Sequence, residues 1–357
     1  MKLLFVVNAD PAQLAGGAIA LASVRYRAAM PAAGLRALGW DVDVISLDQV
    51  LDPAFQFTGD AIVLAQPKED RLLRGDLLPG LGSFIQRHRA AGVRLLIDVS
   101  DLKVGEPYLA HIGRGLRNPA AIALCRQFYP ALLRAADLVV VPTAVLGEHI
   151  QLHAGSHIRF AAVGDTVEVA AAPVRFAPDA AGPLRLLWFG FFGAHAAALA
   201  RFCLSDMPRL AALRPLHLTM LCEAPAAAQI PRLHELAKGS GEIAFQPWSV
   251  PALEAALAAC DAAVFPIDQE SEVSVGKSNN RALQALQAGR AIFAHPIASY
   301  RELQEYGVIA DDLVPGIAAA LADPAACVAR TAAGQAYVAA QYSPAAIAQR
   351  WADVIRS

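Results

Sequence analysis

Short apolar segments alternate with longer segments of helical periodicity along most of this chain, and that alternation limits the folds open to it. In the first half, the apolar segments occupy residues 2–7, 41–46, 61–66, 94–100, 138–143 and 158–164. In the second half, they occupy residues 184–190, 216–222, 243–248, 262–267 and 291–296. Apolar strands separated by helices are typical of parallel sheets that are covered by helices on both faces. We therefore predict an α/β protein built from doubly wound parallel sheets.

The alternation starts a second time after an Ala- and Pro-rich segment at residues 169–182, which we interpret as a linker. A chain of 357 residues also exceeds the about 250–300 residues at which a single core stops growing. We predict Rossmann-like domains over residues 1–168 and 183–341, facing a central cleft that binds ligands at the carboxyl ends of the strands. Ser343-Pro344 is a typical helix start, so we expect residues 342–357 to form a helix that packs back toward the first domain.

Composition excludes several classes of function. The formal net charge is −2, whereas nucleic-acid binding normally requires a basic excess. No apolar run reaches the roughly 18 residues that a membrane span needs, so we expect a soluble, cytoplasmic protein. The five cysteines are scattered, which argues against a zinc site or a disulfide framework. We therefore predict no metal and no nucleic-acid partner.

One triplet, Gly276-Lys277-Ser278, matches the end of a phosphate-binding P-loop. A P-loop also requires a glycine five residues before Gly276, because the loop curls tightly around the phosphate there. That position is Ser271. We conclude that the triplet is not a P-loop.

The same segment is predicted to begin a helix that follows a loop, with Ser278 or Asn279 as the N-cap. The amides of the next residues, including Asn280, then face outward at the positive end of the helix, where anions bind. Lys277 and Arg281 would add two cations beside that end, which suits a diphosphate. A capped helix with solvated Lys and Arg side chains remains the alternative.

Residues 260–303 resemble the donor-binding segment of GT-B glycosyltransferases, and most closely that of family four. Asp261, Pro266, the QALQAG segment Gln284–Gly289 and the strand at 291–296 occupy the matching places. Four further segments also resemble the family, in order along the chain: residues 15–46, 135–150, 184–195 and 243–261. The resemblance thus spans nearly the whole chain.

The resemblance implies a GT-B fold and transfer of a sugar from a nucleotide-activated donor to an acceptor hydroxyl, with retention of configuration. It implies that the first domain binds the acceptor and the second the donor, without a metal or a separate cofactor. A role in bacterial surface glycan synthesis would follow, with a glycan, lipid-linked or protein acceptor. Such acceptors would bring peripheral contact with the inner face of the membrane.

The sequence departs from the family at its paired acids, which are spaced E-x7-E. Here those positions are Gly276 and Gln284. Gln284 keeps the ability to accept a hydrogen bond from a donor hydroxyl, without the charge. A rearranged loop would supply an acid from Glu272 or Glu270. The family's basic pair at the start of the second domain is also missing, so Lys277 and Arg281 would take over charge neutralisation.

The predicted donor site combines this helix start with glycines that allow close approach of the backbone to phosphates, and with aromatic residues beside them. Trp248 lines the nucleotide pocket in this hypothesis, and the alternative is a core tryptophan. The donor site comprises Gly16, Gly17, Gly190, Phe191, Trp248, Glu272, Lys277, Ser278, Asn279, Asn280, Arg281 and Gln284.

Acceptor chemistry is predicted at the carboxyl end of the strand at 94–100. Asp98 or Asp101 would act as a base toward the acceptor hydroxyl or orient it, with Asp101 as a turn cap the alternative. Lys277 and Arg281 would stabilise the leaving diphosphate. The predicted acceptor-binding residues are Arg25, Arg27 and Glu106, and a solvated helix end is the alternative for the arginines.

Two other functions remain open from the sequence. One is a catalytically degenerate GT-B protein that binds nucleotide sugars or serves as a partner subunit, because the paired acids are lost. The other is a sugar-nucleotide epimerase of the same fold, which would turn over the donor without an acceptor.

Overall fold

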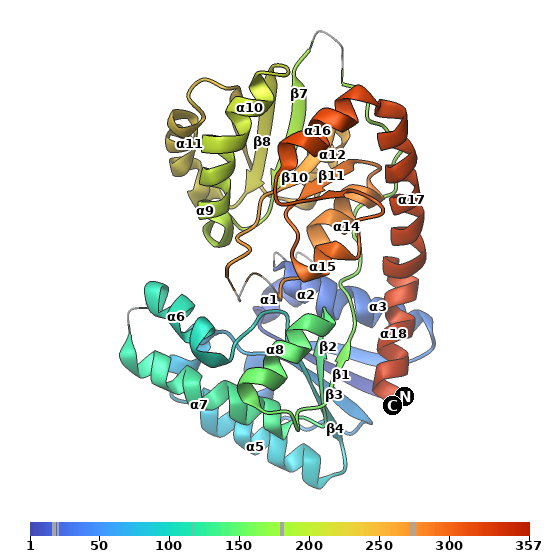
Figure 1. Ribbon diagram of the computed structural model, residues 1–357. Helices are drawn as coiled ribbons and strands as arrows, with labels where there is room; N and C mark the ends of the chain where they lie inside the picture. Colours follow the sequence, from blue (N-terminus) through green and yellow to red (C-terminus); the bar gives the residue numbers. More distant parts are fainter. Residues whose placement is uncertain (16–18, 20, 117, 179–181, 272–273, 275) are drawn as a thin grey trace. The chain divides into compact units, whose positions relative to one another are not determined.

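The computed structural model describes residues 1–357 except 16–18, 20, 117, 179–181, 272–273 and 275 (Figure 1). The chain forms two compact units. The first lobe comprises Met1–Thr166, Gly276–Ser278 and Tyr342–Ser357. The second lobe comprises Val167–Val275 and Asn279–Gln341.

The first lobe contains a six-stranded sheet in the order β2-β1-β3-β4-β5-β6, and all its neighbouring strands pair in parallel. Its strands are β1 (Lys2–Val7), β2 (Asp41–Ser46), β3 (Ala61–Ala65), β4 (Arg94–Asp98), β5 (Leu138–Val141) and β6 (Phe160–Ala162). Its helices are α1 (Pro11–Ala15), α2 (Ala22–Val24), η1 (Arg25–Ala29), α3 (Met30–Ala37), α4 (Leu47–Val50), η2 (Glu69–Leu73), α5 (Leu77–Ala90), α6 (Gly105–Leu116), α7 (Pro119–Ala135), α8 (Ala144–Ala154) and α18 (Pro344–Arg356). This is the helix-covered parallel sheet that the apolar strands predict.

The second lobe contains another six-stranded parallel sheet, in the order β12-β11-β10-β7-β8-β9. Its strands are β7 (Leu184–Phe189), β8 (Leu216–Cys222), β9 (Glu242–Pro247), β10 (Ala262–Phe265), β11 (Ala291–Ala294) and β12 (Val308–Ile309). Its helices are α9 (Phe192–Arg201), η3 (Phe202–Asp206), α10 (Met207–Ala211), η4 (Ala224–Gln229), α11 (Ile230–Ala237), α12 (Val250–Ala259), α14 (Asn280–Gln287), α15 (Ala298–Arg301), α16 (Leu313–Ala322) and α17 (Pro324–Tyr342). Each predicted strand is present, and the short edge strand β12 was not predicted.

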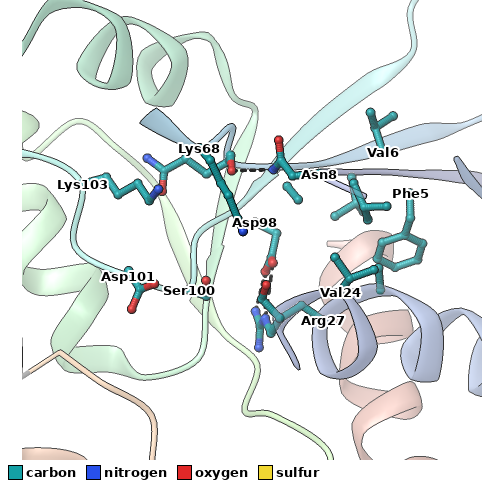
Figure 2. A pocket seen from close by; sticks show the side chains of 16 residues that line it. Phe5, Val6, Asn8, Val24, Arg27, Lys68, Asp98, Ser100, Asp101 and Lys103 are labelled. Atoms are coloured by element: carbon teal, nitrogen blue, oxygen red, sulfur yellow. Dashed lines mark hydrogen bonds and ion pairs between the residues drawn. The ribbon is translucent and has the colours of Figure 1, made fainter. Parts of the chain in front are cut away.

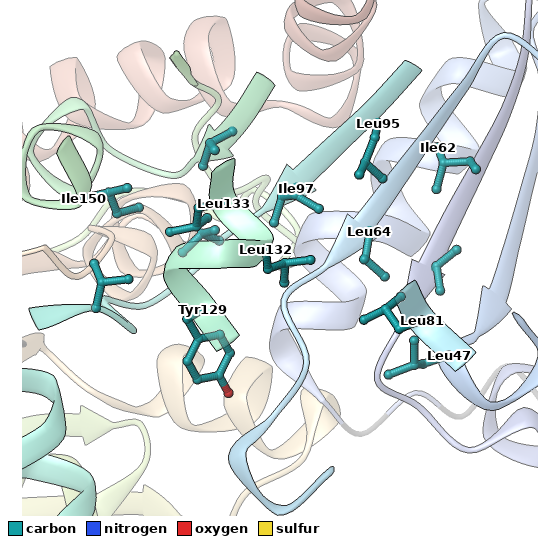
Figure 3. Close-up of a cluster of buried hydrophobic side chains, with 14 of the residues drawn as sticks. Leu47, Ile62, Leu64, Leu81, Leu95, Ile97, Tyr129, Leu132, Leu133 and Ile150 are labelled. Atoms are coloured by element: carbon teal, nitrogen blue, oxygen red, sulfur yellow. The ribbon is translucent and has the colours of Figure 1, made fainter. Parts of the chain in front are cut away.

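The core of the first lobe is a layer of aliphatic side chains between the sheet and its covering helices. Leu64 on β3 and Ile97 on β4 are fully buried, and they belong to the same cluster as Leu133 and Tyr129 of α7 (Figure 3). Burial of each such side chain contributes about 1.5–3 kcal/mol. The cluster therefore holds the strands in place and fixes where their carboxyl ends lie.

Helix α18 belongs to the first lobe although it lies at the far end of the sequence. Trp351 is fully buried, and its ring meets the Phe5 ring edge-on at a centroid distance of 5.5 Å. Gly34 on α3 allows the close packing, since a Cβ there would lie 2.5 Å from the Cβ of Ala348. The last helix thus completes the cover of the first sheet.

Ser343 caps α18 as the sequence predicts, because its hydroxyl accepts a 3.3 Å hydrogen bond from the amide of Ala346. We expect Ser343→Ala to lower the free energy of unfolding of the first lobe by about 1 kcal/mol. Denaturant titration followed by circular dichroism measures the loss. Ser83→Ala, on an exposed position of α5, is the control and should change little; an equal effect of both would contradict the capping role.

No single helix of the described residues is both long and apolar enough to cross a membrane.

Candidate functional site

Each sheet has one point at which the strand order reverses. In the first lobe β1 pairs with both β2 and β3, and in the second lobe β7 pairs with both β8 and β10. In open α/β sheets, ligands bind in the crevice at the carboxyl ends of the strands at such a point. We therefore expect candidate site residues at the ends of β1 and β3 in one lobe and of β7 and β10 in the other.

The first lobe has a cavity of about 80 Å³ at this point. Its walls come from the carboxyl ends of three adjacent strands: Asn8 follows β1, Gln66 follows β3, and Asp98 and Ser100 lie at the end of β4 (Figure 2). Arg27 of η1 closes one side. The cavity thus collects polar side chains from segments that are far apart in the sequence.

Arg27 and Asp98 form a buried ion pair at this cavity. Their side chains are 3% and 5% exposed, and Arg27 Nη2 lies 2.5 Å from Asp98 Oδ1. Arg27 also donates to the carbonyl oxygen of Val163 and lies 3.4 Å from a carboxylate oxygen of Asp165. Burial raises the pKa of Asp98, an effect that Arg27 opposes and Asp165 reinforces. In this state Arg27 is paired within the lobe, and Asp98 is not free to act as a base.

Asp101 is also paired in the first lobe, with the ammonium group of Lys277. The Lys277 charge holds the pKa of Asp101 below its usual range, although burial opposes this. The two side chains are 41% and 31% exposed, so solvent screens the pair. Asp101 is therefore an ionised, accessible carboxylate, and it could take a proton only after Lys277 moves away.

Arg281 occupies the corresponding point of the second lobe. Its guanidinium lies 5.2 Å from the centre of the Phe265 ring at the end of β10 and 6.0 Å from that of Trp188 on β7. One Nη also lies 3.4 Å from the carbonyl oxygen of Phe189. Gly190 follows with φ +147°, and a Cβ there would come within 3.2 Å of the Arg281 side chain. The glycine thus makes room for a cation that is held between two aromatic rings.

The predicted helix start at α14 is present, with Asn279 as its N-cap residue. Asn279 is buried, and its side chain makes no capping bond to the helix. Instead its amide group donates to the carbonyl oxygen of Ser299 at 3.4 Å and to the carboxylate of Glu302. Asn280, the first helical residue, is half-buried, as is Ser278 in the first lobe. The Asn279 side chain is therefore used within the second lobe and does not cap α14.

Gln284 is fully buried on α14. Its side-chain oxygen accepts hydrogen bonds from the amides of Glu168 and Val169, both at 3.1 Å. Two backbone N–H groups thus already donate to the oxygen atom that was expected to accept a hydrogen bond from a hydroxyl of the nucleotide sugar. The structure places Gln284 where it anchors residues 168–169 to the helix.

The other predicted donor residues lie at several places. Phe191 is 66% exposed just before α9, and Trp248 is half-buried after β9, with its amide donating to the carbonyl oxygen of Cys222 at 2.9 Å. Gly16, Gly17 and Glu272 lie outside the described residues.

Two of the predicted acceptor residues are engaged elsewhere. Arg25 donates to the carbonyl oxygen of Ile19 at 2.9 Å, and its guanidinium lies 5.3 Å from the centre of the Tyr26 ring. Glu106 is exposed on α6 and pairs with Arg126 at 3.1 Å. Neither lines the first-lobe cavity, whereas Arg27 does.

Sequence reasoning missed three polar residues beside Arg27. Asn8 directly follows the predicted strand at 2–7, and Gln66 is the last residue of the predicted strand at 61–66, so the rule that ligands bind at carboxyl ends of strands could have found them. Asp165 carries no such signal, because only the folded sheet brings its loop to Arg27.

No family model and no curated protein matches the sequence. Solved structures do resemble it. Sucrose-phosphate synthase from Thermosynechococcus elongatus superimposes with a TM-score of 0.66 at 16% identity, over 99% of this chain and 98% of that one. An E. coli structure described as trehalose-6-phosphate bound with UDP-2-fluoro glucose gives 0.62 at 13% identity, over 100% and 99%. The chain has the GT-B fold.

A glycosyltransferase involved in avilamycin A biosynthesis is also similar, with a TM-score of 0.58, 11% identity and coverage of 100% and 97%. The GT-B fold explains why both lobes carry the same kind of six-stranded parallel sheet. At identities this low, the likeness extends to the fold and leaves the chemistry to the residues of this chain.

Proposed function

We propose that this protein is a glycosyltransferase that moves a sugar from a nucleotide-activated donor to an acceptor hydroxyl. In this proposal the enzyme is a divergent, family-four-like glycosyltransferase. It retains the configuration of the anomeric carbon and acts without a metal or a separate cofactor. Synthesis of a bacterial surface glycan, in the cytoplasm or at the inner membrane face, would be its setting. The acceptor would be a glycan, a lipid-linked sugar or a protein.

One observation carries the donor side of this proposal: Arg281 is held against two aromatic rings beside Gly190 at the switch point of the second sheet. Breaking an anomeric C–O bond leaves negative charge on a diphosphate, and a pre-positioned cation stabilises that charge without reorganising. The N-terminus of α14, the helix that carries Arg281, adds the positive end of a helix dipole. Among the similar structures, the E. coli one contains UDP-2-fluoro glucose, which supports a nucleotide sugar as the donor.

On the acceptor side, Asp101 is the better candidate for a base than Asp98. Its carboxylate is accessible and ionised, whereas Asp98 is buried against Arg27. Once an acceptor hydroxyl takes the place of the Lys277 ammonium group, Asp101 could accept the proton of that hydroxyl or orient the hydroxyl.

Nucleotide binding tests the donor side directly. A thermal-shift titration with UDP, GDP, ADP, CDP and dTDP should identify one diphosphate that stabilises the chain, by about 2.7 kcal/mol at 100 times its dissociation constant. Arg281→Gln should weaken this diphosphate at least tenfold, while Arg232→Gln, on the exposed side of α11, should bind as the wild type does. If no diphosphate binds, the proposed function is excluded.

A degenerate nucleotide-sugar binder is the second candidate, because the places of the family's paired acids hold Gly276 and the buried Gln284. Turnover separates the two. With donor and acceptor mixtures, an enzyme releases nucleoside diphosphate, whereas a degenerate binder shows the thermal shift and no release. An epimerase would convert the donor sugar with no acceptor present.

A further inference from the structure

We propose that the first-lobe cavity binds the hydroxyl-bearing edge of one uncharged sugar ring of the acceptor, with Asn8 and Gln66 as the residues that recognise it. That this sugar is an acceptor rests on the proposed function. The binding site itself stands on three unsatisfied side-chain atoms.

The amide of Asn8 has a fixed orientation. Its Nδ2 donates a 2.8 Å hydrogen bond to the backbone carbonyl oxygen of Gln66. The backbone N–H of Gln66 in turn donates to the backbone carbonyl oxygen of Asp98 at 3.0 Å. These bonds tie the ends of β1, β3 and β4 together, and they leave Asn8 Oδ1 as a pure acceptor at the cavity.

Three polar atoms at the cavity are buried without a hydrogen-bond partner among the described residues: Asn8 Oδ1, Gln66 Oε1 and Gln66 Nε2. Asn8 is 9% exposed and Gln66 8%. Each unpaired polar atom of this kind costs about 1–3 kcal/mol, so the fold alone gives no reason to keep both amides here. A ligand that pairs with them does.

Two unpaired acceptors and one unpaired donor suit the hydroxyl groups of a carbohydrate, because a hydroxyl both donates and accepts hydrogen bonds. A hydroxyl can donate to Asn8 Oδ1 while it accepts from Gln66 Nε2, and a neighbouring hydroxyl can donate to Gln66 Oε1. Phe5 and Val24 also line the cavity and offer an apolar wall to the C–H face of a ring (Figure 2). Mixed amide and apolar walls are what a neutral polyol requires.

Charge and size restrict the ligand further. Arg27 is neutralised by Asp98, and Lys103 pairs with Glu69 at 3.1 Å, so the part of the ligand that enters needs no charge. Lys68 also lines the cavity, which makes an anionic sugar the alternative to be tested. A volume of about 80 Å³ is well below the about 300–1,000 Å³ of a typical small-molecule pocket. It therefore accommodates one edge of a single ring rather than a disaccharide.

The test measures monosaccharide binding to the full chain by saturation-transfer NMR and calorimetry. The probes are D-glucose, D-galactose, D-mannose and N-acetyl-D-glucosamine, each compared with glucose 6-phosphate and inorganic phosphate. We expect at least one neutral sugar to bind in the millimolar range. Gln66→Met should weaken it at least tenfold and leave the melting temperature unchanged or higher, because the variant removes unpaired polar atoms. Gln127→Met, on an exposed position of α7, is the matched control and should alter neither.

Ala65→Leu provides a second variant, since Ala65 lines the cavity and a larger side chain would fill it and abolish sugar binding. Three outcomes overturn the proposal: no neutral sugar binds, only the phosphorylated probes bind, or Gln66→Met lowers the melting temperature and leaves sugar binding intact. The last would mean that ordered water satisfies the amides.

The experiments distinguish failure of the sugar site from failure of the proposed glycosyltransferase function. Gln66→Met should keep the nucleoside-diphosphate shift of the wild type, because Gln66 belongs to the first lobe and Arg281 to the second. Sugar binding that depends on Gln66 in a chain that binds no diphosphate would leave the sugar site standing and remove the glycosyltransferase.

Discussion

Arg281→Gln is expected to lower kcat by about 10²–10³, which corresponds to about 2.7–4 kcal/mol of lost transition-state stabilisation. The guanidinium is held by Trp188, Phe265 and the carbonyl oxygen of Phe189, so its charge is positioned before the diphosphate begins to leave. Glutamine keeps much of the length and the polarity but not the charge. Release of nucleoside diphosphate, measured at saturating donor and acceptor, gives kcat directly.

Arg281→Lys separates charge from packing. Lysine keeps the cation but loses the planar group that stacks against the two rings, so its activity should lie between that of the wild type and that of Arg281→Gln. The melting temperature of each variant shows whether the loss is one of chemistry or of folding. A twofold or smaller change in kcat for a folded Arg281→Gln protein would remove this residue from the reaction.

Arg27→Met is expected to destabilise the first lobe by about 3–5 kcal/mol, because it leaves the carboxylate of Asp98 buried without its partner. Arg27 also lies 5.4 Å from the centre of the Trp351 ring, and methionine should preserve part of that contact. Equilibrium unfolding in urea measures the loss in free energy. The double variant Arg27→Met/Asp98→Leu should recover part of it, since the uncompensated charge is then absent.

The Arg27→Met effect should depend on pH. Burial already raises the pKa of Asp98, and removal of Arg27 takes away the main opposing charge. A group whose pKa is raised in the folded state stabilises the fold below its unfolded pKa, and this stability is lost as the pH rises through the folded value. The variant should therefore be less impaired at pH 5 than at pH 8. An equal loss at both would show that Asp98 is not the cause.

Much of this fold follows from the sequence, because apolar strands of a parallel sheet differ clearly from the helices between them. The site was only partly predictable. Asp98 was found from its place at the end of a strand, but its pairing with Arg27 depends on how the sheet brings β4 and η1 together. Gln284 was predicted to bind the donor because of its position in a family motif. That position gave no sign that two backbone amides donate hydrogen bonds to its side-chain oxygen. The sequence likewise could not show that the side-chain amide of Gln66 lacks hydrogen-bond partners, because this depends on which groups the fold places around it.

The place of α18 in the first lobe has a consequence for biosynthesis. Trp351 packs on Phe5, yet the ribosome makes it only after the entire second lobe has been translated. Until then the nascent first lobe lacks the cover for part of its sheet, and its apolar surface near β1 is available to chaperones or to aggregation. The second lobe, by contrast, contains no segment that is synthesised after residue 341, so it is the one able to complete its core first.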